Sequence, residues 1–190
     1  MENIKKKICS YVPVAEDDLN FLLQFYKKME IRKGHFLVKP EERIAHFYYM
    51  EKGCVCYYKK DETRTKVMEF FTEGSFFTDL YAYIEEIPSG AYLEATEDSL
   101  VYAISKTDVL KAFDRSHGLE RFGRLSMQDG FMRLFRRNNQ LKNLSHQERY
   151  LRLLQKRPHL FQRVPQYLIA SYLGLTPVGL SKIRKRVVEQ

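Results

Sequence analysis

The feature that most constrains the fold is a break between two helical patterns near the C-terminus, in the segment IASYLGLTPVGLSKIRKRV (residues 169–187). Ile169 and Leu173 have the spacing of one face of a short helix. Leu180, Ile183 and Val187 recur at intervals of three and four, which indicates one face of a second helix. The segment therefore predicts a helix, a tight turn and another helix.

The residues between the two patterns suit such a turn. Gly174 can adopt the positive φ that ends a helix. Thr176 has the character of an N-cap, and Pro177 then occupies the first helical position, where its missing N–H is not needed. Ala170 is small enough to let two helix backbones approach closely.

The outer face of the second predicted helix is polar and basic. This is the layout of a helix-turn-helix whose second helix enters the major groove of DNA. The alternative is a helical hairpin with an ordinary solvated basic face. On the first interpretation, we expect the DNA contacts to come from Gln166, Thr176, Pro177, Val178, Ser181, Lys182, Lys185 and Arg186.

The charge is concentrated at the same end of the chain. Residues 1–140 contain 22 Lys and Arg against 22 Asp and Glu, whereas residues 141–190 contain ten against two. The net charge of +8 thus lies within the last fifty residues. This asymmetry predicts a polyanionic partner and a boundary near residue 140.

The N-terminal part of the sequence has a different pattern from the helical C-terminal segment. Residues 16–29 predict an amphipathic helix. Residues 31–105 are rich in β-branched and aromatic residues with short turns between them, which predicts about seven or eight short strands in a barrel or sandwich. Residues 78–91 interrupt this pattern with a short helix and a Pro-Ser-Gly turn.

Two capping patterns introduce further helices. Ser105 and Asp108 have capping-box spacing before one helix, and Ser145 and Glu148 have it before another. Between them, residues 119–141 predict a long helix.

This long helix carries an apolar stripe. We expect the stripe to pair with a second copy of the chain, because a two-fold protein matches the two half-sites that helix-turn-helix proteins bind. The alternative is that the stripe packs only on the β-region. The predicted interface consists of Phe122, Leu125, Met132 and Phe135.

Composition excludes several other classes of protein. No apolar run reaches the length of a membrane span and no signal peptide is evident, so we expect a cytoplasmic protein without a membrane partner. Cys9, Cys54 and Cys56 are too few for a disulfide framework or a four-ligand metal site, and Cys54 and Cys56 are best explained as small buried side chains. A cupin-like enzyme would need clustered metal ligands, and His35 and His46 stand apart. We therefore expect neither an enzyme nor a metal site.

The arrangement as a whole resembles the Crp/Fnr family, the bacterial transcription regulators of the catabolite-activator type. The resemblance rests on Gly53-x-Val55-x-x-Tyr58 and on the element at residues 74–80, GSFFTDL. It also rests on the long helix and on the two C-terminal segments PQYLIASYLGLTP (165–177) and LSKIRK (180–185).

Membership of this family implies an α+β fold with three parts. Residues 1–117 would form a cyclic-nucleotide-binding β-roll, a jelly-roll-like double-stranded β-helix. Residues 118–142 would form a central dimerisation helix, and residues 143–190 a winged helix-turn-helix. The implied partners are double-stranded DNA, a second copy of the chain and RNA polymerase.

The sequence departs from the family where cyclic AMP would bind. Nucleotide-binding members use a Glu for the ribose hydroxyl and, further along, an Arg for the cyclic phosphate. The corresponding residues here are Asp79 and Ser89, and the place for adenine-contacting hydroxyls falls at Leu134-Phe135. Without the guanidinium, the phosphate loses its charge-assisted partner, so cyclic AMP binding in the usual manner is not expected.

The remnant effector pocket is predicted to be empty, filled by side chains, or adapted to an unidentified small-molecule effector. Its predicted residues are Thr78, Asp79, Leu80, Ser89, Gly90, Ala91, Leu134 and Phe135. An iron–sulfur cluster in its place would need a fourth cysteine.

The second helix of the predicted helix-turn-helix also differs from the family pattern. Family members commonly read bases with a Glu and an Arg, and those positions here are Val178 and Lys182. Val178 can touch a thymine methyl, and Lys182 can reach guanine acceptors as a point charge. An alternative function is therefore a dimeric ligand-binding or interaction module whose sequence-specific DNA reading is weakened.

Overall fold

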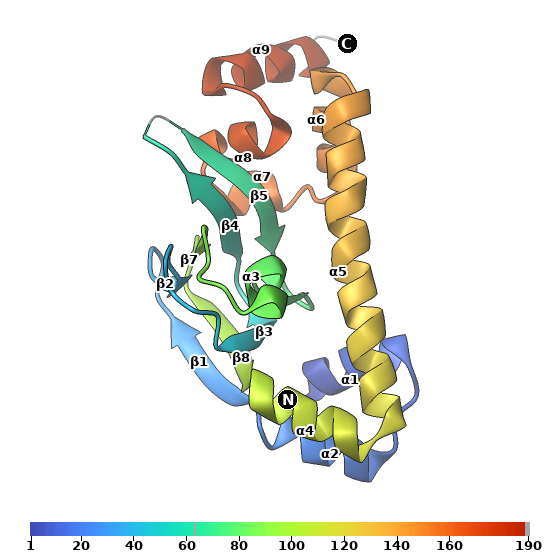
Figure 1. The fold of residues 1–190 in the computed structure, drawn as a ribbon. Helices are drawn as coiled ribbons and strands as arrows, with labels where there is room; N and C mark the ends of the chain where they lie inside the picture. The colour runs from blue at the N-terminus through green and yellow to red at the C-terminus, as the bar shows by residue number, and fades with distance from the viewer. Residues whose placement is uncertain (63, 189–190) are drawn as a thin grey trace. The chain divides into compact units, whose positions relative to one another are not determined.

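The computed structural model describes residues 1–62 and 64–188 and divides the chain into two compact units (Figure 1). The first unit comprises residues 1–57 and 70–132, and the second comprises residues 58–69 and 133–190. One helix, α5 (His117–Asn143), contributes its first part to the first unit and the remainder to the second. Its 27 residues correspond to a length of about 40 Å.

Within the described residues, eight strands form two four-stranded sheets, in the orders β1-β8-β3-β6 and β2-β7-β4-β5. β8 lies between two antiparallel neighbours: Met29 of β1 and Met50 of β3 both face Val101. The strands are β1 (Lys27–Ile31), β2 (Phe36–Val38), β3 (His46–Lys52), β4 (Val55–Lys60), β5 (Thr65–Phe71), β6 (Phe76–Phe77), β7 (Tyr92–Ala95) and β8 (Ser99–Ser105). The structure thus confirms the predicted strand-rich region, which begins a few residues earlier than expected.

The helices of the first unit require one correction. The helix expected over residues 16–29 ends at Leu23, because Lys27–Met29 pair with β8 as part of β1. The first helix was not expected from the sequence, although its Ile4 and Ile8 lie at helical spacing and are fully buried. The helices are α1 (Glu2–Tyr11), α2 (Glu16–Leu23), α3 (Leu80–Glu85), α4 (Lys106–Arg115) and the start of α5.

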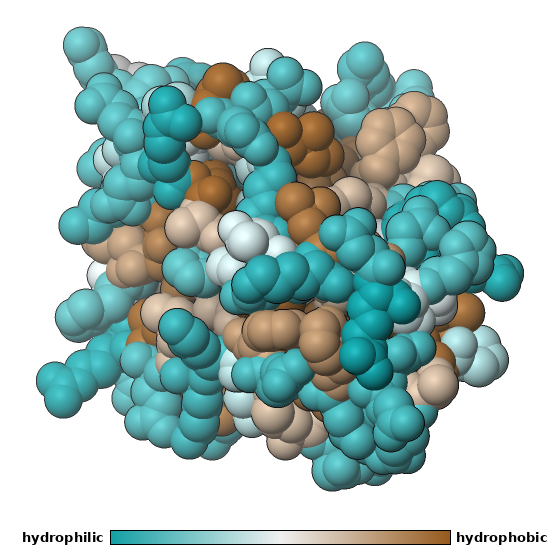
Figure 2. Space-filling model, turned by 60° about the horizontal axis from the view of Figure 1, so that its bottom comes forward, coloured by the Kyte–Doolittle hydropathy of each residue, from teal (hydrophilic) through white to brown (hydrophobic). Residues whose placement is uncertain are grey.

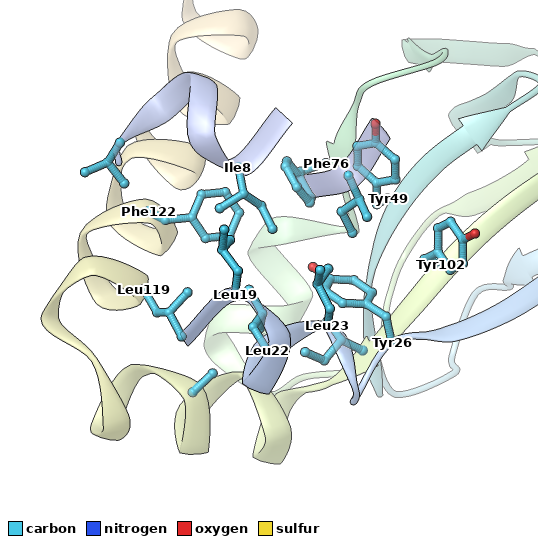
Figure 3. Close-up of a cluster of buried hydrophobic side chains, with 14 residues drawn as sticks. Ile8, Leu19, Leu22, Leu23, Tyr26, Tyr49, Phe76, Tyr102, Leu119 and Phe122 are labelled. Atoms are coloured by element: carbon cyan, nitrogen blue, oxygen red, sulfur yellow. The ribbon is translucent and has the colours of Figure 1, made fainter. Parts of the chain in front are cut away.

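A cluster of buried side chains joins these helices to a sheet (Figure 3). Leu119 and Phe122 of α5 and Ile8 of α1 point toward the same interior as Tyr49 and Phe76 of the strands. The Phe122 ring lies edge-on to the Phe76 ring, with their centroids 5.2 Å apart. This packing anchors the N-terminal half of α5 to the β-region.

The second unit contains the tip of the β4–β5 hairpin and the C-terminal helices. These are the end of α5, α6 (His146–Lys156), α7 (Leu160–Arg163), α8 (Gln166–Leu173) and α9 (Pro177–Val188). The described residues between 143 and 188 contain no strand, and Leu160–Arg163 form one helical turn, so the wing expected within residues 143–190 is not confirmed.

The face of the molecule in Figure 2 is mainly hydrophilic, with apolar residues in separate patches. Among the described residues, no helix combines the length and hydrophobicity that crossing a membrane requires. Within the same residues, no group of His, Cys, Asp and Glu side chains is arranged to hold a metal ion. Cys54 and Cys56 are fully buried, as predicted.

Candidate nucleic-acid interface and effector pocket

The turn between α8 and α9 is built as the sequence predicts. Gly174 has φ 72°, and its N–H donates to the carbonyls of Ala170 and Ser171. The next N–H, of Leu175, donates to the Ala170 carbonyl at 2.8 Å. These bonds satisfy carbonyls that the end of α8 would leave unpaired, and they require the left-handed backbone that glycine adopts without strain.

Thr176 starts α9 as an N-cap. Its hydroxyl accepts a hydrogen bond from the Gly179 N–H at 3.1 Å, and its carbonyl accepts the first helical bond from the Leu180 N–H at 2.9 Å. Pro177 occupies the first helical position. The cap fixes where α9 begins, and therefore which of its residues lie on each face.

Apolar packing holds α9 against α8. Ile169 and Ala170 are fully buried and Leu173 is 3% exposed on α8, and Leu180 is 2% exposed on α9. Ile183 and Val187 continue the inner face of α9 and are partly buried. The opposite face of α9 is thereby turned outward.

All eight residues predicted to contact DNA are exposed. Val178, Lys182 and Lys185 lie at helical spacing on the outer side of α9, which has no acidic residue in its described length. Gln166, at the start of α8, accepts a hydrogen bond from Arg184 of α9 at 3.1 Å. The structure thus brings the two helices together into one basic, exposed surface.

Arg137 holds this surface to the rest of the second unit, a role that the sequence analysis missed. Its guanidinium donates to the carbonyls of Tyr172 (2.7 Å) and Val67 (2.8 Å) and lies 3.9 Å from the centroid of the Tyr172 ring. Burial lowers the pKa of this guanidinium below its usual value. From sequence alone, Arg137 is one of several arginines on a solvated helix, and nothing distinguishes it.

Ser171 makes a second connection, between α8 and β5. Its hydroxyl accepts from the Val67 N–H at 3.0 Å and donates to the Thr65 carbonyl. The Ser171 side chain thus makes hydrogen bonds to the backbone of β5 that a neighbouring strand would otherwise make. The hairpin tip, the end of α5 and α8 form one hydrogen-bonded body.

In the first unit, the residues expected to bind an effector bind one another. The Ser89 hydroxyl donates to Asp79 Oδ2 at 2.7 Å, and Asp79 Oδ1 caps α3 by accepting from the Ala82 N–H. The Tyr57 hydroxyl also hydrogen-bonds the Asp79 carboxylate, and burial raises the pKa of Tyr57 well above its usual value. Asp79 and Ser89 are 4% and 2% exposed.

The neighbouring pocket residues are also held by internal bonds. Ser89 exchanges backbone hydrogen bonds with the loop at Glu41 and Glu42, and its hydroxyl accepts from the Ala91 N–H at 3.0 Å. The Thr78 hydroxyl donates to the His46 carbonyl at 3.0 Å. Leu80 is partly buried and Gly90 is exposed. The polar atoms that would meet a nucleotide therefore already have partners within the chain.

The predicted dimer residues on α5 fall into two groups. Phe122 is 5% exposed, and Leu125 packs against the core of its own unit, so these two have little surface left for a partner. Met132 is partly buried. Phe135, predicted both for the interface and for the effector pocket, belongs to the second unit and is 50% exposed. Leu134, predicted for the effector pocket, belongs to the same unit and is 43% exposed, and the preceding Phe131 is 60% exposed, whereas Asp79 and Ser89 of that pocket belong to the first unit.

Known proteins resemble part of this sequence and share its fold. Residues 28–116 match the family model of the cyclic nucleotide-binding domain. None of the curated protein sequences matches the chain.

Solved structures match over most of the chain. FixK2 from Bradyrhizobium japonicum has a TM-score of 0.72 at 20% identity, over 87% of this chain and 85% of that one. The c-di-GMP-responsive global regulator CLP of Xanthomonas campestris has a TM-score of 0.71 at 18% identity, over 92% of each chain.

The catabolite activator protein of Thermus thermophilus has a TM-score of 0.59 at 16% identity, over 96% of this chain and 87% of that one. Residues 28–116 thus match the model of the cyclic nucleotide-binding domain, and the chain has the fold of these three solved proteins, as expected from its resemblance to the Crp/Fnr family.

Proposed function

We propose that the protein is a homodimeric, DNA-binding transcription regulator of the Crp/Fnr type. The observation that carries the proposal is the exposed basic face of α9, fixed by the Gly174 turn and the Thr176 cap. Such a helix presents cations and short polar side chains where the major groove accepts them. The concentration of positive charge in the last fifty residues supports it further.

Each of three parts of the chain would have its own function. Residues 1–117, whose two four-stranded sheets suit a jelly-roll, would carry the remnant effector pocket. Residues 118–142 would dimerise, and residues 143–190 would bind DNA. In the last part, Lys182, Lys185 and Arg186 would contact phosphates and base edges, with Val178 close to the groove floor.

Salt dependence tests the DNA contact directly. The affinity for duplex DNA should fall as salt rises, with a log–log slope of about −0.9 for each phosphate neutralised. In Lys182→Ala, the slope should become shallower by about one unit and base preference should relax. The matched control is Lys33→Ala, an exposed lysine of the first unit, which should leave both unchanged.

Two results would count against this placement of the recognition helix. One is a Lys182→Ala variant that keeps its full sequence preference. The other is an equal loss of affinity in Lys33→Ala, which would indicate attraction by overall charge. A flat preference across all DNA sequences would support the interaction module instead.

We also propose that cyclic AMP does not bind in the usual manner. The support is the Ser89–Asp79–Tyr57 network, in which the carboxylate and the hydroxyl that would face ribose and phosphate are paired and buried. A buried phosphate would have to break these bonds without gaining a guanidinium. Cyclic AMP should therefore leave the melting temperature unchanged, and a saturable rise would contradict the proposal.

A further inference from the structure

The second unit contains a cleft whose lining is strongly cationic. Its volume is about 220 Å³, and it lies between the end of α5, α6, the end of α8 and Glu69 of β5. Among its described lining residues are seven Arg and Lys side chains and one carboxylate. Such a concentration of like charge is unfavourable unless an anion offsets it.

Internal partners account for only part of this charge. Glu69, 6% exposed, forms an ion pair with Arg157 at 2.7 Å. Arg137 is engaged with carbonyls of the hairpin tip and α8, as described above. Arg136, Arg152 and Lys156 are exposed at the rim.

Arg149 lies deeper. One of its terminal nitrogens donates to the Leu141 carbonyl at 2.8 Å, while its Nε is buried and has no hydrogen-bond partner among the described residues. A buried donor of a charged group is costly when it is left unpaired. Burial also lowers the pKa of this guanidinium below its usual value.

We propose that this cleft binds a compact phosphate polyanion of the diphosphate class. Guanidinium groups bind phosphate oxygens bidentately, and several of them converge here. The volume is smaller than the 300–1,000 Å³ typical of sites for drug-sized ligands, so the group recognised is a small one. The Leu141, Leu153 and Leu173 side chains and the Tyr172 ring form the apolar part of the wall.

The site differs from the pocket around Asp79 and Ser89, which belongs to the other unit. It also differs from the outer face of α9, because no α9 residue is among its described lining residues. Its ligand is therefore distinct both from a cyclic nucleotide in the first unit and from the DNA at α9.

The test is a calorimetric titration of the full-length protein with inorganic pyrophosphate at physiological salt. We expect saturable binding, with one pyrophosphate per chain. Arg136→Gln and Arg152→Gln should each weaken it about tenfold, the value of a lost hydrogen bond between charged groups. Both residues are exposed, so the variants should fold normally.

Two variants serve as comparisons. Arg124→Gln removes an exposed arginine of α5 outside the cleft, and it should leave the affinity unchanged. Glu69→Gln removes the carboxylate that occupies Arg157, and it should tighten binding. The comparison of Arg124→Gln with the two rim-arginine variants separates a specific site from general charge attraction, because all three substitutions remove one positive charge.

Absence of saturable binding would overturn the proposal. So would an Arg124→Gln effect equal to that of Arg152→Gln, or equally tight binding of citrate, which would remove the assignment to phosphate. A further overturning result is a loss of duplex-DNA affinity in the Arg136→Gln/Arg152→Gln double variant as large as that in Lys182→Ala, because the cleft would then belong to the DNA-binding surface. The titration itself needs no DNA, so its outcome does not depend on the proposed regulator function.

Discussion

The hydroxyl of Ser89 joins three parts of the first unit. It donates to Asp79 at 2.7 Å and accepts from the Ala91 N–H at 3.0 Å, in a setting where Ser89 is 2% exposed. Local sequence cannot predict such a pairing, because residues 79 and 89 meet only after α3 and the Pro-Ser-Gly turn have folded. The sequence analysis placed both residues in a pocket, and their bond to each other was not foreseen.

Ser89→Ala should therefore destabilise the protein. The substitution leaves the buried Asp79 carboxylate and the Ala91 N–H each short of a partner, which costs about 1–3 kcal/mol. Urea denaturation measures the change. Ser181→Ala, at an exposed position of α9, should stay within about 0.5 kcal/mol of the wild type, and an equal loss there would contradict the argument.

Gly123 marks a close approach between α5 and α4. A Cβ at this position would lie 2.1 Å from the Phe113 ring, so Gly123→Ala should cost about 1–3 kcal/mol through overpacking. The control is Gly118→Ala in the same helix, where the nearest atom would be 3.5 Å away. Thermal melts should show a loss for residue 123 only, and equal behaviour of the two variants would show that Phe113 moves aside freely.

Among the helices and strands, the features that depend only on neighbouring residues were predicted correctly from the sequence. The caps at Ser105, Ser145 and Thr176 and the Gly174 turn are all present, because each depends on residues within a few positions. The helix over residues 16–29 was cut short because pairing with β8 outweighs helical periodicity at residues 27–29. The predicted wing is not confirmed, and Leu160–Arg163 form a helical turn.

The capping box of α6 makes the stability of this element depend on pH. The Ser145 hydroxyl and N–H donate to the Glu148 carboxylate at 2.6 and 2.8 Å, and they hold the pKa of Glu148 below its usual 4.5. A carboxyl with a lowered folded-state pKa adds stability above about pH 4.5, and this stability is lost as pH falls through the folded-state value.

Ser145→Ala should accordingly destabilise the protein by about 1 kcal/mol near neutral pH. Its difference from the wild type should shrink in acid, because protonated Glu148 no longer accepts these bonds in either protein. Denaturant melts between pH 3 and pH 7 would measure this, and a difference that stayed constant or grew in acid would contradict the capping argument.

At the scale of the whole molecule, the structure narrows the proposed dimer surface. Sequence reasoning treated the apolar stripe of α5 as one interface, but its first residues face the core of their own unit. Of the residues predicted for the interface, Phe135 is exposed. Phe131 and Leu134, which were not predicted for it, are also exposed and lie beside Phe135 at spacings of three and four along the helix. We propose that α5 of a second copy of the chain packs against this exposed face.

Leu134→Glu should therefore convert the dimer to a monomer, because it places a charge in the centre of the proposed contact. Leu110→Glu is the matched control: Leu110 is 52% exposed on α4, compared with 43% for Leu134 on α5. Sedimentation equilibrium should give a monomer for the first variant and a dimer for the second. A Leu134→Glu variant that remained dimeric would remove α5 from the interface.

We propose that α9 gives a two-fold protein sequence-specific access to DNA. This claim is tested most directly by selection of binding sites from a random duplex pool with the purified protein and no added ligand. We expect enrichment of an inverted repeat with half-sites about one helical turn apart. Lys182→Ala should weaken this enrichment and relax the selected sequence while the fold is retained. Selected sequences no different from the starting pool would contradict the claim.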